Sequence, residues 1–479
     1  MPPGGSWPIL TADLVRAAGA SARRRIEASL PTGGRPSGHP VPRRLRRLAP
    51  PPYFCAVLSF PLASLPFDFT ARALRWAAGF AHCAYFEPNR LSYPAGPFEQ
   101  LLGVAAEAPD APRTLAELRS WQQREGAAPG FGFLTYEVKN EIEQLTSANF
   151  SGLDWPVLHF FRPQTWLRWD GERVEIHGHT AGVLDAILAT PVPAVPPVRV
   201  PLLRARLPKA DYLRTVEAVR EDILNGEVYE LNLCQELYAE AVVLDPVEVF
   251  LRLQAASPAP FAGFFRHRHH YLLCASPERF LARRGATILS QPIKGTIRRG
   301  TTAAEDEQQR LRLLHDEKER AENLMIVDLV RNDLARVAQT GTVQVPELFG
   351  LYPFRQVWQM ISTVQAALRP DVGMVDVLRA SFPMGSMTGA PKIRAMQLIE
   401  QYERTRRGLY SGSIGYVWPS GDFDFNVVIR SLQYRQDTGY LSLQVGSAIT
   451  YDSVAEREYE ECLLKARAVL EVLGATVSE

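Results

Sequence analysis

The chain has 479 residues, of which 46% are hydrophobic and 22% are charged, a composition typical of a globular protein rather than a disordered or fibrous one. Its formal net charge is +1, so no global field favours binding to nucleic acid or to an anionic membrane. No apolar run is long enough to cross a bilayer. An acidic small-molecule substrate would therefore have to be held by local charges.

The five cysteines are widely scattered and include no Cys-x-x-Cys pair. An odd, unpatterned set favours a reducing compartment and argues against a zinc site. We therefore expect a cytoplasmic protein without a membrane span.

Residues 1–52 differ from the rest of the chain, because they are rich in Pro, Gly and Arg and have only Asp13 and Glu27 as acids. Such a segment buries little apolar surface, which predicts a disordered basic extension. An upstream stretch translated from a mis-assigned start codon would look the same, and a basic targeting arm or nucleic-acid tether is the alternative. The apolar stretch 53–65 imitates a signal peptide, but it lies too deep in the chain and Pro61 interrupts it.

Residues 57–190 are predicted to form an N-terminal subdomain of mixed structure. The pattern favours an amphipathic helix over 71–79 and strands over 83–86 and 130–136. The Pro-rich segment 191–201 is extended and is the clearest internal boundary.

Residues 205–475 form the second predicted domain, in which helical patterns alternate with short strand patterns. Helices are predicted over 208–226, 314–338 and 453–473, and strands over 271–275, 288–291 and 441–445. This alternation indicates an α+β architecture with a predominantly antiparallel sheet.

Lys294 is the first candidate for chemistry, in the string Gln291-Pro292-Ile293-Lys294-Gly295-Thr296. A lysine between a strand-like run and a glycine turn cannot easily extend to water. If it is buried, desolvation favours the neutral amine, which is a nucleophile. The alternative is an ordinary surface-loop lysine.

Glu278 follows the strand-like run 271–275. Pro277 and Phe280 would give it an apolar wall that raises the pKa of its carboxyl, as a general acid near neutrality requires. The alternative is a solvated glutamate paired with Arg279.

Two predicted helices each carry carboxylates on one face. Glu319 and Glu322 are three residues apart, and Glu458, Glu461 and Lys465 follow an i, i+3, i+7 spacing. Two such faces could share a Mg²⁺ ion that keeps several waters and takes a substrate carboxylate as a further ligand. The alternative is two solvated helix faces with charge pairs such as Glu461–Lys465.

Three further features could hold a ligand. The Gly-rich turn 384–392 leads into a predicted helix over 393–402 and could bind an anion through backbone N–H groups, although it lacks the ending of a Walker loop. Arg430 lies in the strand-like run 427–430, where its charge needs an anionic partner. Tyr410 could donate its hydroxyl to a ligand, although a core tyrosine is the commoner case.

Together, these strings resemble the chorismate-utilising enzyme family in a consistent order along the chain. The motifs that match are Tyr229–Gln235, Ser276–Phe280, Pro292–Thr296, Arg320–Asp333, Gly385–Lys392, Gly412–Tyr416 and Glu458–Glu461. The resemblance is strong over residues 205–475 and looser over 57–190. It implies a large, mostly antiparallel two-sheet β-sandwich surrounded by helices, as in anthranilate synthase component I.

Within this family, the aminodeoxychorismate synthases resemble the chain in having lysine at the centre of the Pro292–Thr296 motif, where anthranilate synthases usually have alanine. The resemblance implies that Lys294 attacks C2 of chorismate while Glu278 protonates the departing C4 hydroxyl. Ammonia would then add at C4 and expel the lysine. The product would be 4-amino-4-deoxychorismate, for p-aminobenzoate and folate synthesis.

The resemblance also implies the binding residues. Mg²⁺ would bridge the ring carboxylate of the substrate to Glu322 and Glu461, with Glu319 and Glu458 in support. The positions that match substrate-binding residues of the family are Thr388, Gly389, Tyr410, Arg430, Gly446 and Lys465.

Some positions depart from the family pattern. Glu230 stands where related sequences often have Gln, and Ala448 replaces a usual Gly. Gln359 replaces a His that is linked in relatives to pyruvate elimination, which an enzyme that keeps the enolpyruvyl group does not need. Residues 258–261 resemble part of a tryptophan pocket of the family, but we do not expect tryptophan binding from them.

The sequence shows no glutaminase signature, so ammonia would come from solution or from a separate glutamine amidotransferase subunit. Two alternatives remain: an anthranilate synthase component I, and a chorismate- or tryptophan-binding regulatory protein without turnover. Lys294 argues against the first. The presence of the general acid and all four glutamates argues against the second.

Overall fold

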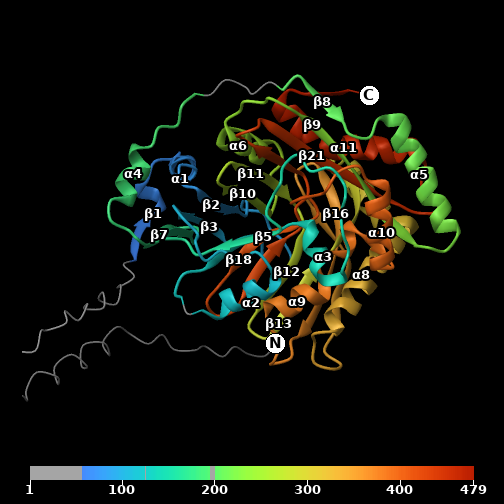
Figure 1. The fold of residues 1–479 in the computed structure, drawn as a ribbon, viewed down its shortest axis with the longest axis horizontal. Coiled ribbons are helices and arrows are strands. Elements are labelled where there is room, and N and C mark those ends of the chain that lie inside the picture. The colour runs from blue at the N-terminus through green and yellow to red at the C-terminus, as the bar shows by residue number, and fades with distance from the viewer. Residues whose placement is uncertain (1–56, 125, 195–199, 479) are drawn as a thin grey trace, which may run out of the picture. The chain divides into compact units, whose positions relative to one another are not determined.

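Two large sheets form the centre of the computed structural model, which describes residues 57–124, 126–194 and 200–478 (Figure 1). Within these residues the larger sheet has thirteen strands, and all its pairings are antiparallel except that of β8 with β22. In spatial order its strands are β1 (Leu58–Pro61), β7 (Arg173–Gly178), β6 (Thr165–Trp169), β3 (Gln100–Ala105), β2 (His82–Glu87), β10 (Phe261–His267), β11 (His270–Ser276), β20 (Ser431–Arg435), β21 (Tyr440–Ile449), β9 (Glu230–Ala239), β8 (Leu202–Ala205) and β22 (Thr476–Ser478), with β17 (Gly389–Ala390) paired to β9.

The smaller sheet has nine strands within the described residues and is antiparallel throughout. Its spatial order is β14 (Ile293–Arg298), β16 (Val357–Ala367), β13 (Thr287–Gln291), β12 (Arg279–Arg284), β19 (Phe423–Asn426), β18 (Ser413–Val417), β4 (Gly130–Leu134) and β5 (Leu158–Phe161), with β15 (Gln344–Pro353) paired to β16. The α+β class and the predominance of antiparallel pairing are confirmed.

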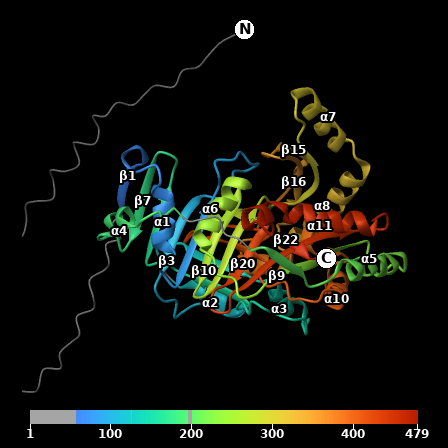
Figure 2. The ribbon, with the colours of Figure 1, turned by 90° about the horizontal axis from the view of Figure 1, so that it is seen from above.

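Helices cover the outer faces of both sheets. They are α1 (Phe69–Ala77), α2 (Leu115–Gln123), α3 (Lys139–Glu143), α4 (Val183–Ala189), α5 (Lys209–Leu224), α6 (Pro246–Ala256), α7 (Ala303–Leu314), α8 (Glu317–Ala335), α9 (Met374–Ser381), α10 (Lys392–Tyr402) and α11 (Ala455–Leu473). Side chains of α1, α4, α5, α6, α10 and α11 form one core with the larger sheet, and those of α2, α8 and α9 form another with the smaller sheet. Figure 2 shows α7 above β15 and β16, at the side of the molecule where α8 and α11 also lie.

The two sheets pack against each other through a third core that is rich in aromatic rings. Phe86 and Phe265 come from the larger sheet, and Phe131 and Tyr416 come from the smaller one. The rings of Phe86 and Tyr416 meet edge to face with centroids 5.3 Å apart, an arrangement that aromatic pairs prefer. The expected two-sheet sandwich is therefore present, with helices outside it.

The predicted domains 57–190 and 205–475 contribute strands to the same sheets. β2 pairs with β10 in the larger sheet, and β4 pairs with β18 in the smaller one. Phe54–Glu479 accordingly forms one compact unit, so the Pro-rich boundary at 191–201 separates segments in sequence and not in space. The extension predicted over 1–52 lies outside the described residues.

All three long predicted helices are present. The predictions over 208–226 and 453–473 are confirmed by α5 and α11. The helix predicted over 314–338 is confirmed by α8, which begins three residues later than predicted, after a break between Leu314 and Glu317 that separates it from α7. At this break Asp316 caps α8 by accepting a hydrogen bond from the Glu319 backbone N–H, so the N-cap starts a new helix.

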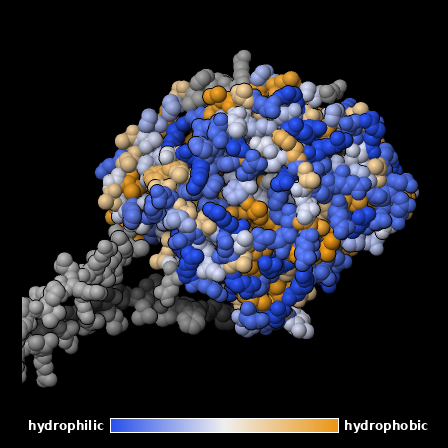
Figure 3. All heavy atoms as spheres, viewed as in Figure 1, coloured by the Kyte–Doolittle hydropathy of each residue, from blue (hydrophilic) through white to orange (hydrophobic). Residues whose placement is uncertain are grey.

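Within the described residues, no helix combines the length and the apolar character needed to cross a membrane. The face drawn in Figure 3 is mostly hydrophilic and has small, separate hydrophobic patches. Isolated apolar residues of this kind are ordinary on a protein surface.

Candidate active site

Lys294 lies on β14, the edge strand of the smaller sheet, with only 11% of its side chain exposed. Its Nζ donates a hydrogen bond to Glu230 Oε1 at 2.5 Å. The lysine is therefore buried, as expected. The expectation of a neutral amine is wrong for this state: burial acts to lower the pKa of Lys294, but Glu230 and Glu322 outweigh it and raise the pKa overall.

Glu230 reaches Lys294 from the other sheet. Residues alternate along β9, so Leu231 and Leu233 pack in the core beside the helices while Glu230 points to the opposite face. Glu230 is fully buried, and its Oε2 has no hydrogen-bond partner among the described residues. Glutamate at this position, where related sequences often have Gln, thus adds a negative charge. Within the described residues its only ion pair is with Lys294, the candidate nucleophile.

Gly295 fixes the backbone beside Lys294. Its φ of +97° lies in the region that residues with a Cβ rarely adopt, and a Cβ there would lie 3.1 Å from Met360 Cβ and 3.4 Å from Glu319 Oε2. From α8, Asn323 donates a hydrogen bond to the Lys294 carbonyl at 3.2 Å. Ser362 on β16 in turn donates to Asn323 Oδ1 at 2.6 Å. These contacts hold α8, and hence its glutamates, against the strand that carries the lysine.

Glu278 lies between β11 and β12 and is 4% exposed. Burial raises the pKa of its carboxyl to about 7, against the opposing effect of a hydrogen bond from Ser386 Oγ to Glu278 Oε1 at 2.8 Å. The predicted elevation of the pKa is confirmed. Lys294 and Lys465 also influence this carboxyl electrostatically, which places Glu278 within the same charged site.

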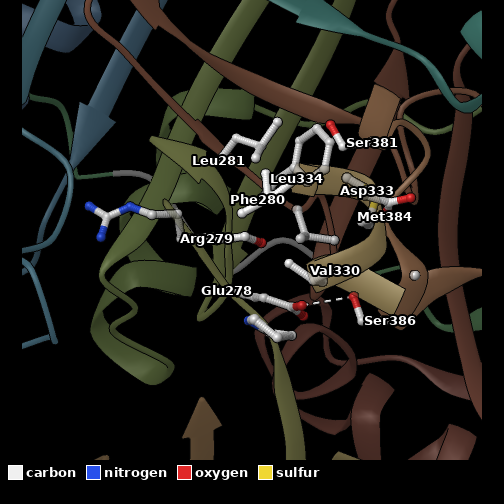
Figure 4. A pocket seen from close by; sticks show the side chains of 14 residues that line it. Glu278, Arg279, Phe280, Leu281, Val330, Asp333, Leu334, Ser381, Met384 and Ser386 are labelled. Atoms are coloured by element: carbon white, nitrogen blue, oxygen red, sulfur yellow. Dashed lines mark hydrogen bonds between the residues drawn. The ribbon is translucent and has the colours of Figure 1, made fainter. Parts of the chain in front are cut away.

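Figure 4 shows Glu278 and Ser386 facing each other at one end of a small cavity, with Phe280, Val330 and Leu334 on its apolar wall. Lys294 and the four glutamates predicted to bind metal do not line this cavity. The cavity is therefore an apolar environment behind Glu278, the candidate general acid.

The alternative pairing of Glu278 with Arg279 does not occur. The Arg279 guanidinium points away from the cavity (Figure 4) and forms two hydrogen bonds of 2.9 Å with the Asp424 carboxylate. Both side chains of this ion pair are fully buried. Arg279 therefore pairs with Asp424, and Glu278 remains available to act as an acid.

Glu319 and Glu322 lie on α8 with their predicted three-residue spacing. Burial raises the pKa of Glu319 to about 7, and Glu322, Asp316 and Glu461 add to this effect. The pKa of Glu322 is also raised, first by burial, although Lys294 opposes the shift. Carboxylates that repel one another in this way form a site that favours a cation.

Glu458, Glu461 and Lys465 lie on α11, which packs against β21. Burial acts to raise the pKa of Glu461, but Lys465 at 2.7 Å and other cations lower it overall. Glu458 is buried and accepts a hydrogen bond from Ser453 at 2.8 Å. No three of the four glutamates form a converged ligand set within the described residues, so an ion would draw their side chains together.

Gly446 lies where β21 passes closely beside β9. A Cβ at this position would lie 2.6 Å from Cys234 Sγ and 2.7 Å from the Leu233 carbonyl oxygen, so glycine is required. The Gly446 carbonyl accepts a hydrogen bond from Lys465 Nζ at 2.8 Å. This contact holds the lysine at the inner face of α11.

Thr388 and Gly389 connect the Gly-rich turn to the larger sheet. Gly389 pairs with Leu231 in β9, and the Thr388 carbonyl accepts a hydrogen bond from the Asn232 backbone N–H at 2.9 Å. The predicted helix after the turn is confirmed as α10. The turn therefore lies beside the strand that bears Glu230.

Tyr410 is buried, and its hydroxyl accepts a weak hydrogen bond from Cys234 Sγ at 3.8 Å. The strand predicted over 427–430 is wrong, because these residues lie between β19 and β20 and Arg430 has a φ of +53°. Arg430 forms no salt bridge with any described residue. Burial lowers the pKa of its guanidinium, which Tyr410 and Glu461 partly oppose.

Two positions that depart from the family pattern, Gln359 and Ala448, lie on strands. Gln359 on β16 is buried, and its Oε1 has no hydrogen-bond partner among the described residues. Ala448 on β21 lies opposite Asn232 on β9. In the 258–261 segment, Ala259 and Phe261 are buried, and their carbonyls accept side-chain hydrogen bonds from Asn89 and Asn426.

The sequence did not predict the contacts that three residues make in this site. Glu230 was noted only as a departure, Ser386 only as part of a turn, and Asn323 only as part of a motif. Strand alternation could have placed Glu230 opposite its leucine neighbours, but its contact with Lys294 joins residues from different sheets. No spacing rule predicts such a contact.

Comparison with known proteins identifies the class. The family described as chorismate binding enzyme matches residues 82–471. Aminodeoxychorismate synthase component 1 of Bacillus subtilis is 32% identical over 366 residues, which cover 73% of this chain and 77% of that protein. The chain belongs to the chorismate binding enzyme family.

Two further similarities bear on the architecture. The probable chloroplastic aminodeoxychorismate synthase of Oryza sativa is 42% identical over 268 residues, which cover 55% of this chain and 30% of that protein, so the chain spans less than a third of that relative. The crystal structure of anthranilate synthase component I from Streptococcus pneumoniae superposes with a TM-score of 0.65 and 25% identity, covering 88% of this chain and 93% of that one.

Proposed function

We propose that this chain converts chorismate and ammonia to 4-amino-4-deoxychorismate, with Lys294 as a covalent nucleophile. The observation that supports this most strongly is the buried lysine that forms an ion pair with Glu230 at 2.5 Å and is coupled electrostatically to Glu278 and Glu322. The names of the relatives from Bacillus subtilis and Oryza sativa agree with this activity.

The ion pair makes the proton on Lys294 the first obstacle to catalysis, since only the neutral amine is a nucleophile. Three carboxylates raise the pKa of the lysine, Glu230 most, then Glu322 and Glu278. Neutralising Glu322 would remove one of these effects and lower the pKa of Lys294. The amine is therefore expected to become available only when the negative charge of the acidic cluster, formed by Glu319, Glu322, Glu458 and Glu461, is neutralised.

The chemistry of the acidic cluster fits Mg²⁺, which prefers carboxylate oxygens and retains waters. Glu322 and Glu461 would hold the ion, with Glu319 and Glu458 in support. Burial, to which the repulsion of Glu322, Asp316 and Glu461 adds, already raises the pKa of Glu319 to about 7. When bound, the ion would neutralise these carboxylates and attract the ring carboxylate of the substrate.

In the first step, neutral Lys294 forms a bond to C2 of chorismate as the two conjugated ring double bonds shift and the bond from C4 to its hydroxyl breaks. Protonated Glu278 gives its proton to the departing oxygen, which leaves as water, and Glu278 becomes a carboxylate. The elevated pKa of about 7 keeps this carboxyl protonated near neutrality.

In the second step, ammonia forms a bond to C4, both double bonds shift back, and the C2–N bond breaks so that the lysine leaves as an amine. The added nitrogen then loses a proton to the Glu278 carboxylate, which restores the acid. Atoms and charges balance over the cycle, because chorismate and ammonia yield the aminated product and water.

The remaining cationic and polar groups would hold the substrate's carboxylates. Arg430 has no ion pair within the described residues. Tyr410 and Glu461 act on the pKa of its guanidinium, so Arg430 lies at the site and is free to pair with an anion. Lys465, Gly446, Thr388 and Gly389 complete the proposed pocket. A dianion surrounded by such groups is stabilised most strongly where water is excluded.

Ammonia is proposed to come from glutamine through a separate amidotransferase subunit, and the reaction to take place in the cytoplasm. The four described cysteines are all free thiols and buried, which is compatible with a reducing compartment. The same protein supplied with ammonium salt would then need no amidotransferase.

Incubation of the protein with chorismate, ammonium and Mg²⁺, followed by product identification, tests the proposal. We expect 4-amino-4-deoxychorismate. Anthranilate with pyruvate as the only products would instead assign an anthranilate synthase, and saturable chorismate binding without turnover would assign a regulatory protein. Lys209→Ala, which changes a lysine on α5, serves as the matched control for Lys294→Ala.

A further inference from the structure

Three histidines from three strands meet between the two sheets, away from the residues discussed above. His82 begins β2, His267 ends β10, and the two are direct neighbours in the register of the larger sheet. His159 lies on β5, the edge strand of the smaller sheet. The cluster therefore joins the two sheets.

The rings are close enough to share one ion. One ligand nitrogen of each histidine lies within 4.8 Å of those of the other two. The ring centroids of His159 lie 5.0 Å from those of His82 and 4.3 Å from those of His267. His82 and His159 are each 4% exposed, whereas His267 is partly exposed and gives access from outside.

Each ring also has a nitrogen with unused hydrogen-bonding capacity. Nδ1 of His82, Nε2 of His159 and Nδ1 of His267 are buried without a hydrogen-bond partner among the described residues. Buried polar groups normally have a partner, and leaving one without costs about 1–3 kcal/mol. Three such atoms in a single cluster indicate a missing common partner.

The surroundings favour neutral imidazoles. Burial lowers the pKa of all three histidines, and Arg268 adds to the effect for each. Phe133 and Phe161 pack beside the rings, with centroids 5.8 Å from His159 and His82 respectively. The other nearby cation, Arg266, is occupied elsewhere, because it donates to the Ala78 carbonyl and lies over the Tyr271 ring. Neutral imidazole is the form that binds a transition metal.

We propose that His82, His159 and His267 form a Zn²⁺ site that links the two sheets, with water as the fourth ligand. Three histidines with an open fourth position are an established ligand set for zinc, and the imidazole donors suit zinc better than the Mg²⁺ proposed for the glutamates. Zinc–nitrogen bonds of about 2.0–2.1 Å would draw the ring nitrogens together by small side-chain movements.

This site was not predicted from the sequence, which argued against zinc from its cysteines alone. The three histidines are far apart in the chain and follow no ligand spacing. Only the pairing of β2 with β10 and the packing of β5 against them bring the rings together.

The test uses the full-length chain, freed of metal with a chelator. Co²⁺ is added as a spectroscopic probe, and Zn²⁺ affinity is measured by competition with a chromophoric chelator. We expect one tetrahedral Co²⁺ per chain, displaced by one equivalent of Zn²⁺, and a higher melting temperature with Zn²⁺. His269→Ala, at the exposed tip of the same hairpin, is the matched control and should bind like the wild type.

His159→Phe replaces the buried ligand with a ring that suits the aromatic surroundings, and His267→Gln alters the partly exposed ligand in case the first variant does not fold. Each should weaken Zn²⁺ binding at least tenfold and abolish the Co²⁺ spectrum. Zn²⁺ binding that is unchanged in a folded variant would overturn the proposal. So would the absence of stoichiometric binding to the wild type, which would make the cluster a stack of aromatic rings only.

Discussion

At the scale of single residues, the proposed mechanism makes the pairing of Lys294 with Glu230 the control on when the amine can act as a nucleophile. The carboxylate raises the pKa of the amine, and the short contact of 2.5 Å joins two groups that are otherwise buried. An ion pair of this kind is strongly sensitive to the loss of either partner, because the other charge then remains buried alone.

Glu230→Gln tests this control, because it removes the negative charge and keeps the size of the side chain. Without the carboxylate, burial acts on Lys294 with less opposition, and its pKa falls. The limb of the pH profile of kcat/KM that rises as Lys294 loses its proton should therefore move to lower pH. An unchanged rising limb would show that Glu230 does not hold the proton on the nucleophile.

In the proposed mechanism, Glu278 determines the opposite limb of the pH profile. A carboxyl with a pKa of about 7 is protonated below that pH, so activity that depends on its proton should fall as the pH rises through about 7. The hydrogen bond from Ser386 lowers the pKa of Glu278. In Ser386→Ala the falling limb should therefore shift to higher pH.

Ser290→Ala is the control for this shift, because Ser290 lines the same cavity but donates no hydrogen bond to Glu278. Its pH profile should match that of the wild type. A similar shift in both variants would attribute the effect to the cavity and not to the hydrogen bond.

Much of the candidate site could be predicted from sequence at this scale, but its proton states could not. The strings around Lys294 and Glu278 indicated a nucleophile and an acid, and the elevated pKa of Glu278 followed from its apolar neighbours. The charged state of Lys294 depends on Glu230, which belongs to the other sheet. A contact between distant strands leaves no periodic trace in the sequence.

At the scale of elements, α8 and α11 bring their glutamates to the strand that bears the lysine. Glu322→Gln should raise the Mg²⁺ concentration needed for half-maximal activity by about tenfold or more, because it removes one charged ligand. Glu317→Gln on the exposed side of the same helix should leave the Mg²⁺ requirement unchanged. Equal Mg²⁺ dependence in the two variants would contradict the proposed role of this helix face.

The short strand β17 depends on Gly389, whose φ is +141° and whose added Cβ would lie 2.1 Å from the Glu230 carbonyl oxygen. Gly389→Ala should lower the free energy of unfolding by about 3 kcal/mol or more, from backbone strain and the displacement of β9. Gly285→Ala is the matched control, since its φ is also positive but a Cβ there meets nothing within 4 Å. It should cost only ~1–2 kcal/mol. Chemical denaturation measures both, and similar losses would contradict the close approach to β9.

The element boundaries that sequence failed to predict have local causes. The N-cap at Asp316 starts α8 three residues after the predicted beginning of that helix. The run ending at Arg430 is rich in β-branched residues, but it leaves the sheet through a backbone conformation with positive φ. In both places a single residue's hydrogen bond or dihedral angle overrides the hydrophobic pattern.

At the scale of the whole molecule, the two sheets are built from both halves of the chain. The α+β class followed from the patterns, and the two-sheet sandwich followed from the family resemblance. The way in which β2 and β4 complete sheets formed by later segments could not be read from composition, because the Pro-rich segment resembles a domain boundary. Strand pairing between distant segments is set by the packing of the whole molecule.

This architecture places Glu230 from one sheet against Lys294 from the other, so the proposed nucleophile lies where the two sheets meet. The central claim is that this lysine becomes bonded to carbon. The most direct test is intact-mass analysis, with peptide mapping, of the protein incubated with chorismate and Mg²⁺ but without ammonia. The account predicts a chorismate-derived adduct on Lys294 that ammonium discharges and that Lys294→Ala lacks. Normal amination by a folded Lys294→Ala variant, without any adduct on the wild-type protein, would contradict it.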